Sequence, residues 1–303
     1  MFIKKGIIYK PSNVNWVKSH LWVPTAYKLN NEKIIIYFAG RNKKNESDIG
    51  YFIYDIKKNK VTNFSNGPIL KRGSLGSFDD SAVIPSHIIK VKKIYYLYYI
   101  GWTQGKKIPY IPSIGLAYSK SLKSKFKKYS KSPILDKNYN DQYFIASCFV
   151  RKIKKNFIMD YTSNLSWKKI RSGTFPRYLI KTCRSKDGFN WQTNKNITVP
   201  FQNNKEVAIT RPWILKSKRK YFMFTSIKKK NYKIKILKSN DGFKWNRMDK
   251  KIFSEKNKTK FDSVSQEYAS LIKMKDKLYM FYNGNDYGKN GICLAISNTN
   301  FLA

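Results

Sequence analysis

The chain has 303 residues and a formal net charge of +43, because 61 Lys and Arg face only 18 Asp and Glu. No apolar run approaches the ~20 residues of a membrane-spanning helix, and Lys4 and Lys5 interrupt the apolar stretch that a secretory leader would need. The composition therefore predicts no transmembrane segment and no leader. Cys148, Cys183 and Cys293 lie in apolar patterns without metal-binding spacing. Such thiols are typical of a reducing compartment, so we expect a cytoplasmic protein.

One pattern recurs five times along the chain. Each repeat has a short apolar strand, then an aromatic-rich strand that ends near a small residue, then a third strand that in four repeats closes on Ser. The aromatic strands span 34–40, 94–101, 157–163, 221–226 and 278–284, and the third strands span 49–54, 114–119, 180–185, 234–239 and 292–297. A β-rich repeat of this kind is typical of propeller blades, which are stable only when they pack against neighbours. We predict an all-β, five-bladed β-propeller in one domain, residues 1–303, with blades at roughly 16–65, 78–122, 142–191, 206–247 and 262–301.

Two segments following third strands share the pattern Ser-x-Asp-Gly-Phe-x-Trp, at 185–191 and 239–245. Asp-Gly favours a tight hairpin turn because Gly tolerates positive φ. We expect Asp187 and Asp241 to form turns and Trp191 and Trp245 to pack between blades.

The first strand of each repeat is expected to line the central channel, and polar residues near its start are candidates for a site. The second repeat offers Asp79 and Asp80, the fourth Glu206 and Arg211, and the fifth Asp262 and Glu267, whereas the first offers His20. Paired carboxylates suit glycosidic bond cleavage, since one protonates the leaving oxygen and the other attacks or activates water. We assign Asp80, Glu206 and Glu267 as catalytic candidates, Asp79, Arg211 and His20 as substrate-binding candidates, and Asp262 as a turn cap. The alternative is that these acids pair with Arg211 and Lys residues to hold blades together.

Tryptophans flank the same strand starts. Trp22, Trp102 and Trp213 are candidate substrate contacts, and Trp167 lies in a comparable position. Indole faces stack on the apolar faces of sugar rings, although most Trp residues serve in cores. Together they favour a carbohydrate over a nucleotide.

The repeats resemble the propeller glycosidase superfamily of arabinanases, levansucrases and invertases, which includes glycoside hydrolase families 43, 32 and 130. The resemblance rests on segments 78–85, 96–102, 114–119 and 280–285 and on the two Asp-Gly-Phe-x-Trp segments. It implies a five-bladed fold and a sugar ligand. Families 43 and 32 place an Asp in the first blade and an acidic Glu in the third, and this chain has neither. Only Asp79 or Asp80 matches by blade, at the position of the second Asp of the family.

These observations predict a carbohydrate-active propeller, a glycosidase or a related glycosyl-transferring enzyme acting on a surface or polysaccharide-type glycan. The alternative is a propeller that binds a glycan or a protein without hydrolysis. The basic charge allows an anionic carbohydrate as the partner. Nucleic acid is disfavoured because no Arg-rich helix or RNP-like motif is present. We expect no cofactor, because no Gly-rich phosphate loop opens a helix, and no metal site from His20 and His87 alone.

Overall fold

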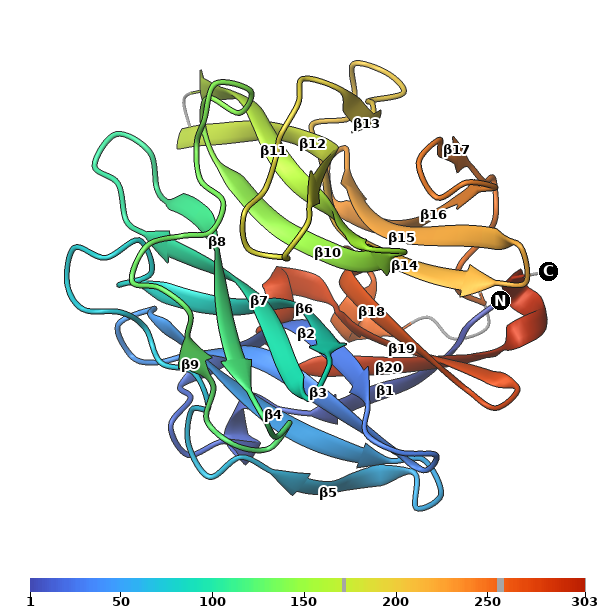
Figure 1. The fold of residues 1–303 in the computed structure, drawn as a ribbon. Helices are drawn as coiled ribbons and strands as arrows, with labels where there is room; N and C mark the ends of the chain where they lie inside the picture. Colours follow the sequence, from blue (N-terminus) through green and yellow to red (C-terminus); the bar gives the residue numbers. More distant parts are fainter. Residues whose placement is uncertain (171–172, 255–258, 303) are drawn as a thin grey trace.

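The computed structural model describes residues 1–170, 173–254 and 259–302, and it is built almost entirely of β-strands. Within these ranges the strands pair into five antiparallel units. Figure 1 shows the first strand of each unit near the centre of the molecule and the last strands of the first four units at the periphery. The predicted all-β class is confirmed.

The units follow one another along the chain. The first contains β2 (Ser19–Lys28), β3 (Lys33–Arg41), β4 (Ser47–Asp55) and β5 (Lys60–Phe64). The second contains β6 (Ala82–Val91), β7 (Ile94–Thr103), β8 (Ile111–Ser119) and β9 (Lys127–Lys128). The third contains β10 (Ile145–Ile153), β11 (Asn156–Ile170), β12 (Gly173–Ser185) and β13 (Ile197–Val199). The fourth contains β14 (Ala208–Ser217), β15 (Lys220–Lys228), β16 (Tyr232–Ser239) and β17 (Asn246–Arg247).

The fifth unit joins the two ends of the chain. Its strands β18 (Glu267–Met274), β19 (Lys277–Asn283) and β20 (Ile292–Asn298) are followed in the sheet by β1 (Ile3–Tyr9) from the N-terminus. Strand β1 pairs antiparallel with β20, and Figure 1 places the two termini close together. The N-terminal strand thereby closes the ring, a contribution that the sequence analysis did not foresee. Short 3-10 turns surround these strands: η1 (Pro11–Asn13), η3 (Lys260–Asp262), η4 (Asn285–Gly288) and η5 (Thr299–Leu302).

Every inner strand carries a β-bulge near its start. The register shifts in β2, β6, β10, β14 and β18 where each pairs with the second strand of its unit. In four of these strands a non-glycine residue at the bulge has positive φ: Val23, Ser147, Arg211 and Tyr268. A bulge bends the strand and redirects side chains. The recurring bulge therefore determines which residues face the centre of the ring.

Apolar clusters fill the spaces between neighbouring units. Trp191 packs edge-on against Tyr98 of the second unit at 6.2 Å, and Trp245 packs against the cluster of the fourth and fifth units. Asp187 and Asp241 accept hydrogen bonds from backbone N–H groups of the turns that follow them. For Asp187 these hydrogen bonds together outweigh burial, which acts in the opposite direction, and the pKa of both carboxyls is lowered to about 2. The Ser-x-Asp-Gly-Phe-x-Trp segments therefore serve as turns and inter-unit packing, as the sequence predicts.

Candidate functional site

Aromatic side chains from several units line one funnel at the centre of the ring. Its inner part has an empty volume of about 580 Å³, and its mouth has an empty volume of about 1470 Å³. The two parts share five aromatic residues, which come from four elements and one loop: Trp22 (β2), Trp102 (β7), Tyr110, Tyr178 (β12) and Tyr268 (β18). Since both parts share this wall, they form one continuous site.

The rings on this wall contact one another. Trp22 and Trp102 lie 5.3 Å apart at 59°, and Tyr110 stacks on Trp102 at 5.2 Å. Trp167 contacts Tyr110 edge-on at 5.6 Å. The indole nitrogen of Trp22 is buried and has no hydrogen-bond partner among the described residues. The wall thus offers flat apolar ring faces, which suit the C–H faces of a ligand.

Hydroxyl groups contribute the polar part of the funnel floor. Ser147, Thr162 and Thr210 line the inner part, and the hydroxyls of Thr162 and Thr210 are 2.8 Å apart. The hydroxyl of Ser147 is buried without a hydrogen-bond partner among the described residues. The polar part of the floor that a ligand can meet is therefore the pair of hydroxyls of Thr162 and Thr210.

Arg211 reaches across the ring from the inner strand of the fourth unit. Its guanidinium donates to the carbonyl of Ser86 at 2.6 Å and to the carbonyl of Pro24 and the hydroxyl of Thr25 at 2.8 Å. These contacts link the first, second and fourth units. Complete burial lowers the pKa of Arg211 to about 9. Trp213 is also buried and donates from its indole nitrogen to the carbonyl of Leu271. Both polar groups are therefore bound to the scaffold.

His20 lies near Arg41, Lys289 and Asp286. Its ring nitrogen is 2.9 Å from the hydroxyl of Ser19. Burial, followed by the positive charges of Arg41 and Lys289, lowers the pKa of His20 to about 4. The imidazole is consequently neutral at physiological pH.

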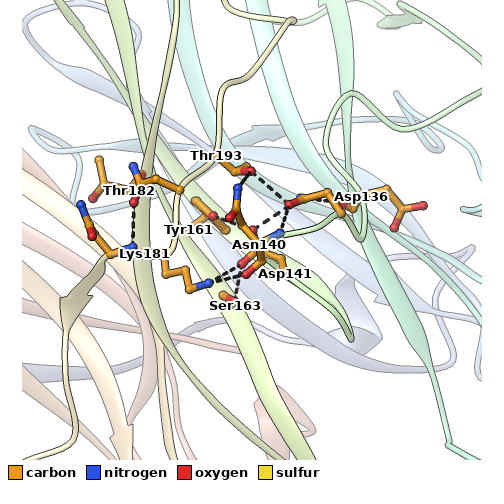
Figure 2. Close-up of polar contacts among 11 residues, drawn as sticks. Asp136, Asn140, Asp141, Tyr161, Ser163, Lys181, Thr182 and Thr193 are labelled. Carbon is orange, nitrogen blue, oxygen red and sulfur yellow. Dashed lines mark hydrogen bonds and ion pairs between the residues drawn. The ribbon is translucent and has the colours of Figure 1, made fainter.

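Three acids before the first strands of their units, the site candidate Asp79 among them, are engaged in a repeated structural arrangement. Asp141 accepts hydrogen bonds from Tyr161 and Ser163 and pairs with Lys181, whose Nζ lies 3.0 Å away (Figure 2). Asp79 pairs with Tyr99 and Lys128, and Asp262 pairs with Tyr282 and Lys4. In all three cases the Tyr follows the Asp by 20 residues. The cation comes from β9 in the second unit, β12 in the third and β1 in the fifth, so each carboxylate joins the start of its unit to a later strand of the same sheet.

Glu206 has the same function in the fourth unit with a different cation. Its two oxygens accept hydrogen bonds from the two terminal nitrogens of Arg247 at 2.8 Å, and Oε2 also accepts one from the backbone N–H of Gln202.

Asp80 accepts hydrogen bonds from the backbone N–H of Gly76 and from the hydroxyl of Ser81. These hydrogen bonds outweigh partial burial and lower the pKa of Asp80. Neither carboxylate belongs to the described lining of the funnel.

Glu267 differs from the other predicted acids. Its side chain is buried at the start of β18, directly before the funnel residue Tyr268, and its Oε2 has no hydrogen-bond partner among the described residues. Burial raises the pKa of Glu267 to about 8, opposed by a hydrogen bond from the backbone of Tyr287 and by the charge of Lys228. Both Tyr287 and Lys228 line the mouth. Glu267 is thus a carboxylic acid that keeps its proton at neutral pH beside the funnel.

The structure brings Trp22 and Trp102 together on the wall and places Glu267 next to it. It places Asp79, Asp80, Glu206, Arg211, His20 and Trp213 outside the described lining. Sequence analysis missed Tyr110, Tyr178 and Tyr268, although Tyr268 follows Glu267 directly. Among the described residues, no group of three His, Cys, Asp or Glu side chains could hold a metal ion. No helix in the described ranges is long and apolar enough to cross a membrane.

No family model matches the chain. It is 28% identical over 295 residues to "Uncharacterized protein Rv1502" of Mycobacterium tuberculosis, covering 97% of this chain and 98% of that protein. Among solved structures, one described as "Glycoside hydrolase" aligns with a TM-score of 0.77 at 18% identity, over 97% of this chain and 91% of the other. "Crystal structure of a thermostable family-43 glycoside hydrolase" aligns with a TM-score of 0.69 at 15% identity, over 94% of this chain and 92% of the other. At these identities the likeness shows the fold: the chain has the β-propeller fold of these glycosidases. The predicted resemblance to them is confirmed at that level.

Proposed function

We propose that the protein is a carbohydrate-active propeller that binds a glycan in the aromatic funnel. One observation carries the proposal: Trp22, Trp102, Tyr110, Tyr178 and Tyr268 converge on one cavity from four units. Ring faces bind the apolar faces of sugars, while the hydroxyls of Thr162 and Thr210 on the floor can bond to sugar hydroxyls. The shared fold with glycoside hydrolases supports a glycan as the ligand.

In this proposal Glu267 is the proton donor for cleavage or transfer of a glycosidic bond. A general acid must be protonated at working pH, and the raised pKa of about 8 gives Glu267 that property. The acid protonates the leaving oxygen as the bond to the anomeric carbon breaks, and a water or a sugar hydroxyl adds to that carbon. The proton released by the attacking group restores the acid. Asp79, Glu206 and Arg211 have structural roles here, because their charged groups are already bound by the scaffold.

A second candidate function is glycan binding without hydrolysis. It is favoured by a specific observation: the described residues that line the funnel include no carboxylate, and Asp79, Glu206 and Asp262 are paired with Lys or Arg. Hydrolysis with two carboxyl groups requires both to reach the sugar. The two candidates predict the same binding and differ in turnover.

The test combines binding and turnover on one set of proteins. Purified wild type is incubated with a panel of oligosaccharides, and products are followed by chromatography while binding is followed by Trp fluorescence. We expect Trp102→Ala to lose at least about 10-fold in affinity, as a central aromatic contact should. We expect Glu267→Gln to keep binding and lose turnover, whereas the exposed control Glu32→Gln keeps both.

Binding without turnover in the wild type would select the second candidate. Binding that is unchanged in Trp102→Ala would contradict the funnel as the glycan site.

The three cysteines are buried and form no disulfide, and disulfides are rare in the cytoplasm. This observation supports a cytoplasmic site of action in our proposal.

A further inference from the structure

Arg41 lies in the wall of the funnel mouth without a counter-ion among the described residues. It ends β3, and its guanidinium carbon lies 4.5 Å from the centre of the Trp22 ring. Its Nε is buried without a hydrogen-bond partner, and no carboxylate in the described ranges pairs with it. Burial disfavours the charge of this guanidinium and lowers its pKa. A partly buried cation without an anion is costly for the fold.

Further cations line the same mouth. Lys228 at the end of β15 lies over the Tyr232 ring at 5.4 Å. Lys229 and Lys230 follow it in the turn, and Lys168 of β11 belongs to the same lining. With Arg41, the described lining of the mouth contains five cations and no acid. The described lining of the mouth is therefore purely cationic. In the scaffold, by contrast, each paired acid has a cation as its partner.

We propose that the glycan bound in this funnel carries an oxyanion, a phosphate or a carboxylate, which Arg41 binds on Trp22 while Lys228, Lys229 and Lys230 surround it. The inference rests on the proposed glycan-binding function and names the chemical class of the ligand. A guanidinium fixed on an indole presents its planar N–H groups in a defined direction, and those groups match both oxygens of a carboxylate or phosphate. Lys229 and Lys230, which are exposed, add attraction over a longer range. The sugar ring then stacks on Trp102 and Tyr110, which are neighbours of Trp22 in the wall.

The experiment compares matched neutral and anionic ligands. Wild type is titrated by Trp fluorescence with glucose, galactose and mannose, with their uronates, with their 1- and 6-phosphates, and with inorganic phosphate alone. At least one sugar anion is expected to bind about 10- to 100-fold more tightly than its neutral parent, the range that a charged hydrogen bond contributes. The uronate and phosphate arms show which oxyanion the site takes.

The variant Arg41→Gln is expected to lose this preference and to keep the weak binding of the neutral sugar. Lys155→Gln, an exposed substitution in the turn between β10 and β11, is the matched control, because it removes the same charge outside the described lining of the mouth. It should leave the preference unchanged, which separates the site from general attraction to a chain of +43. If Arg41→Gln does not fold, the double variant Lys229→Gln/Lys230→Gln replaces it as the test, because both lysines are exposed. It should weaken the binding of the sugar anion by about 10-fold.

Four results would overturn the inference. Neutral sugars binding as tightly as their anions would refute it while leaving glycan binding intact. If Arg41→Gln and Lys155→Gln lose the preference for sugar anions equally, the preference comes from the overall positive charge of the chain and not from a specific site. If inorganic phosphate binds as tightly as every sugar phosphate, the funnel binds an anion without recognising the sugar. That result would count against the proposed function itself. The absence of binding to any sugar anion would contradict the inference outright.

Discussion

The proton on Glu267 makes the stability of the protein depend on pH in a defined direction. The pKa of Glu267 rises from 4.5 to about 8 on folding. Between these values the folded protein holds a proton that the unfolded chain releases, so the free energy of unfolding falls as pH rises. Each pKa unit corresponds to about 1.4 kcal/mol, and the full shift therefore corresponds to about 5 kcal/mol.

The two histidines act in the opposite direction at lower pH. Burial lowers the pKa of His20 from 6.5 to about 4 and that of His87 from 6.5 to about 3. Their neutral forms stabilise the folded state, and this contribution is lost as pH falls below 6.5. At pH 6.5 the histidines of the unfolded chain are half protonated, so their opposing contribution to the slope fades only between pH 6.5 and about 7.5. Between pH 6.5 and 8 Glu267 should thus lower the free energy of unfolding by about 2 kcal/mol.

The assay is urea unfolding followed by Trp fluorescence at pH values from 6.5 to 8 for the wild type, Glu267→Gln and the control Glu32→Gln. Over this range the free energy of unfolding of the wild type and of Glu32→Gln should fall by about 2 kcal/mol relative to that of Glu267→Gln, because an amide has no proton to release. The histidines contribute equally in all three proteins and cancel in this difference. A Glu267→Gln protein with the same slope as the wild type would refute the protonated state of Glu267 and with it the proposed proton donor.

Two further predictions concern the scaffold. Asp141→Asn should destabilise the protein by about 3 to 5 kcal/mol, because Lys181 becomes a buried unpaired cation, and urea unfolding should show that adding Lys181→Met recovers part of the loss. Deletion of residues 1–9 should prevent cooperative thermal unfolding in calorimetry, since it removes β1 and the Lys4 partner of Asp262, and retained cooperativity would contradict the closing role of β1.

The strands of the ring could be predicted from the sequence because each strand has its own local pattern of residues. Alternation of apolar and aromatic residues fixes a strand wherever both faces are buried, and the five aromatic strands appear at the expected positions in β3, β7, β11, β15 and β19. The closing strand β1 was not predicted. Its partner β20 lies at the other end of the chain, 293 residues away in the pair Ile3 and Ile296, and a pairing over that separation leaves no local pattern.

Individual acids were harder to place than strands. Glu206 and Glu267 both stand at the beginning of an inner strand, so their sequence contexts look alike. Arg247 reaches Glu206 from β17, whereas no cation pairs with Glu267 at ion-pair distance in the described ranges. A signal was present for the paired acids: the spacing of 20 residues from Asp79 to Tyr99 recurs from Asp141 and from Asp262. That recurrence indicates a structural repeat, since a catalytic residue has no reason to appear in one unit after another.

The arrangement of charge connects the two proposals through Lys228. Its positive charge opposes the burial of Glu267 and so favours loss of the proton from that carboxyl. An oxyanion bound beside Lys228 would offset this charge, and Glu267 would then hold its proton more tightly when the funnel is occupied than when it is empty. By linkage, the anionic ligand should bind more tightly at pH values below about 8, where Glu267 is already protonated, than above it. For a bound anion to strengthen the hold of Glu267 on its proton, a cation must lie near the acid and no second carboxylate may line the funnel. The described lining meets both conditions, since it contains Lys228 and no carboxylate.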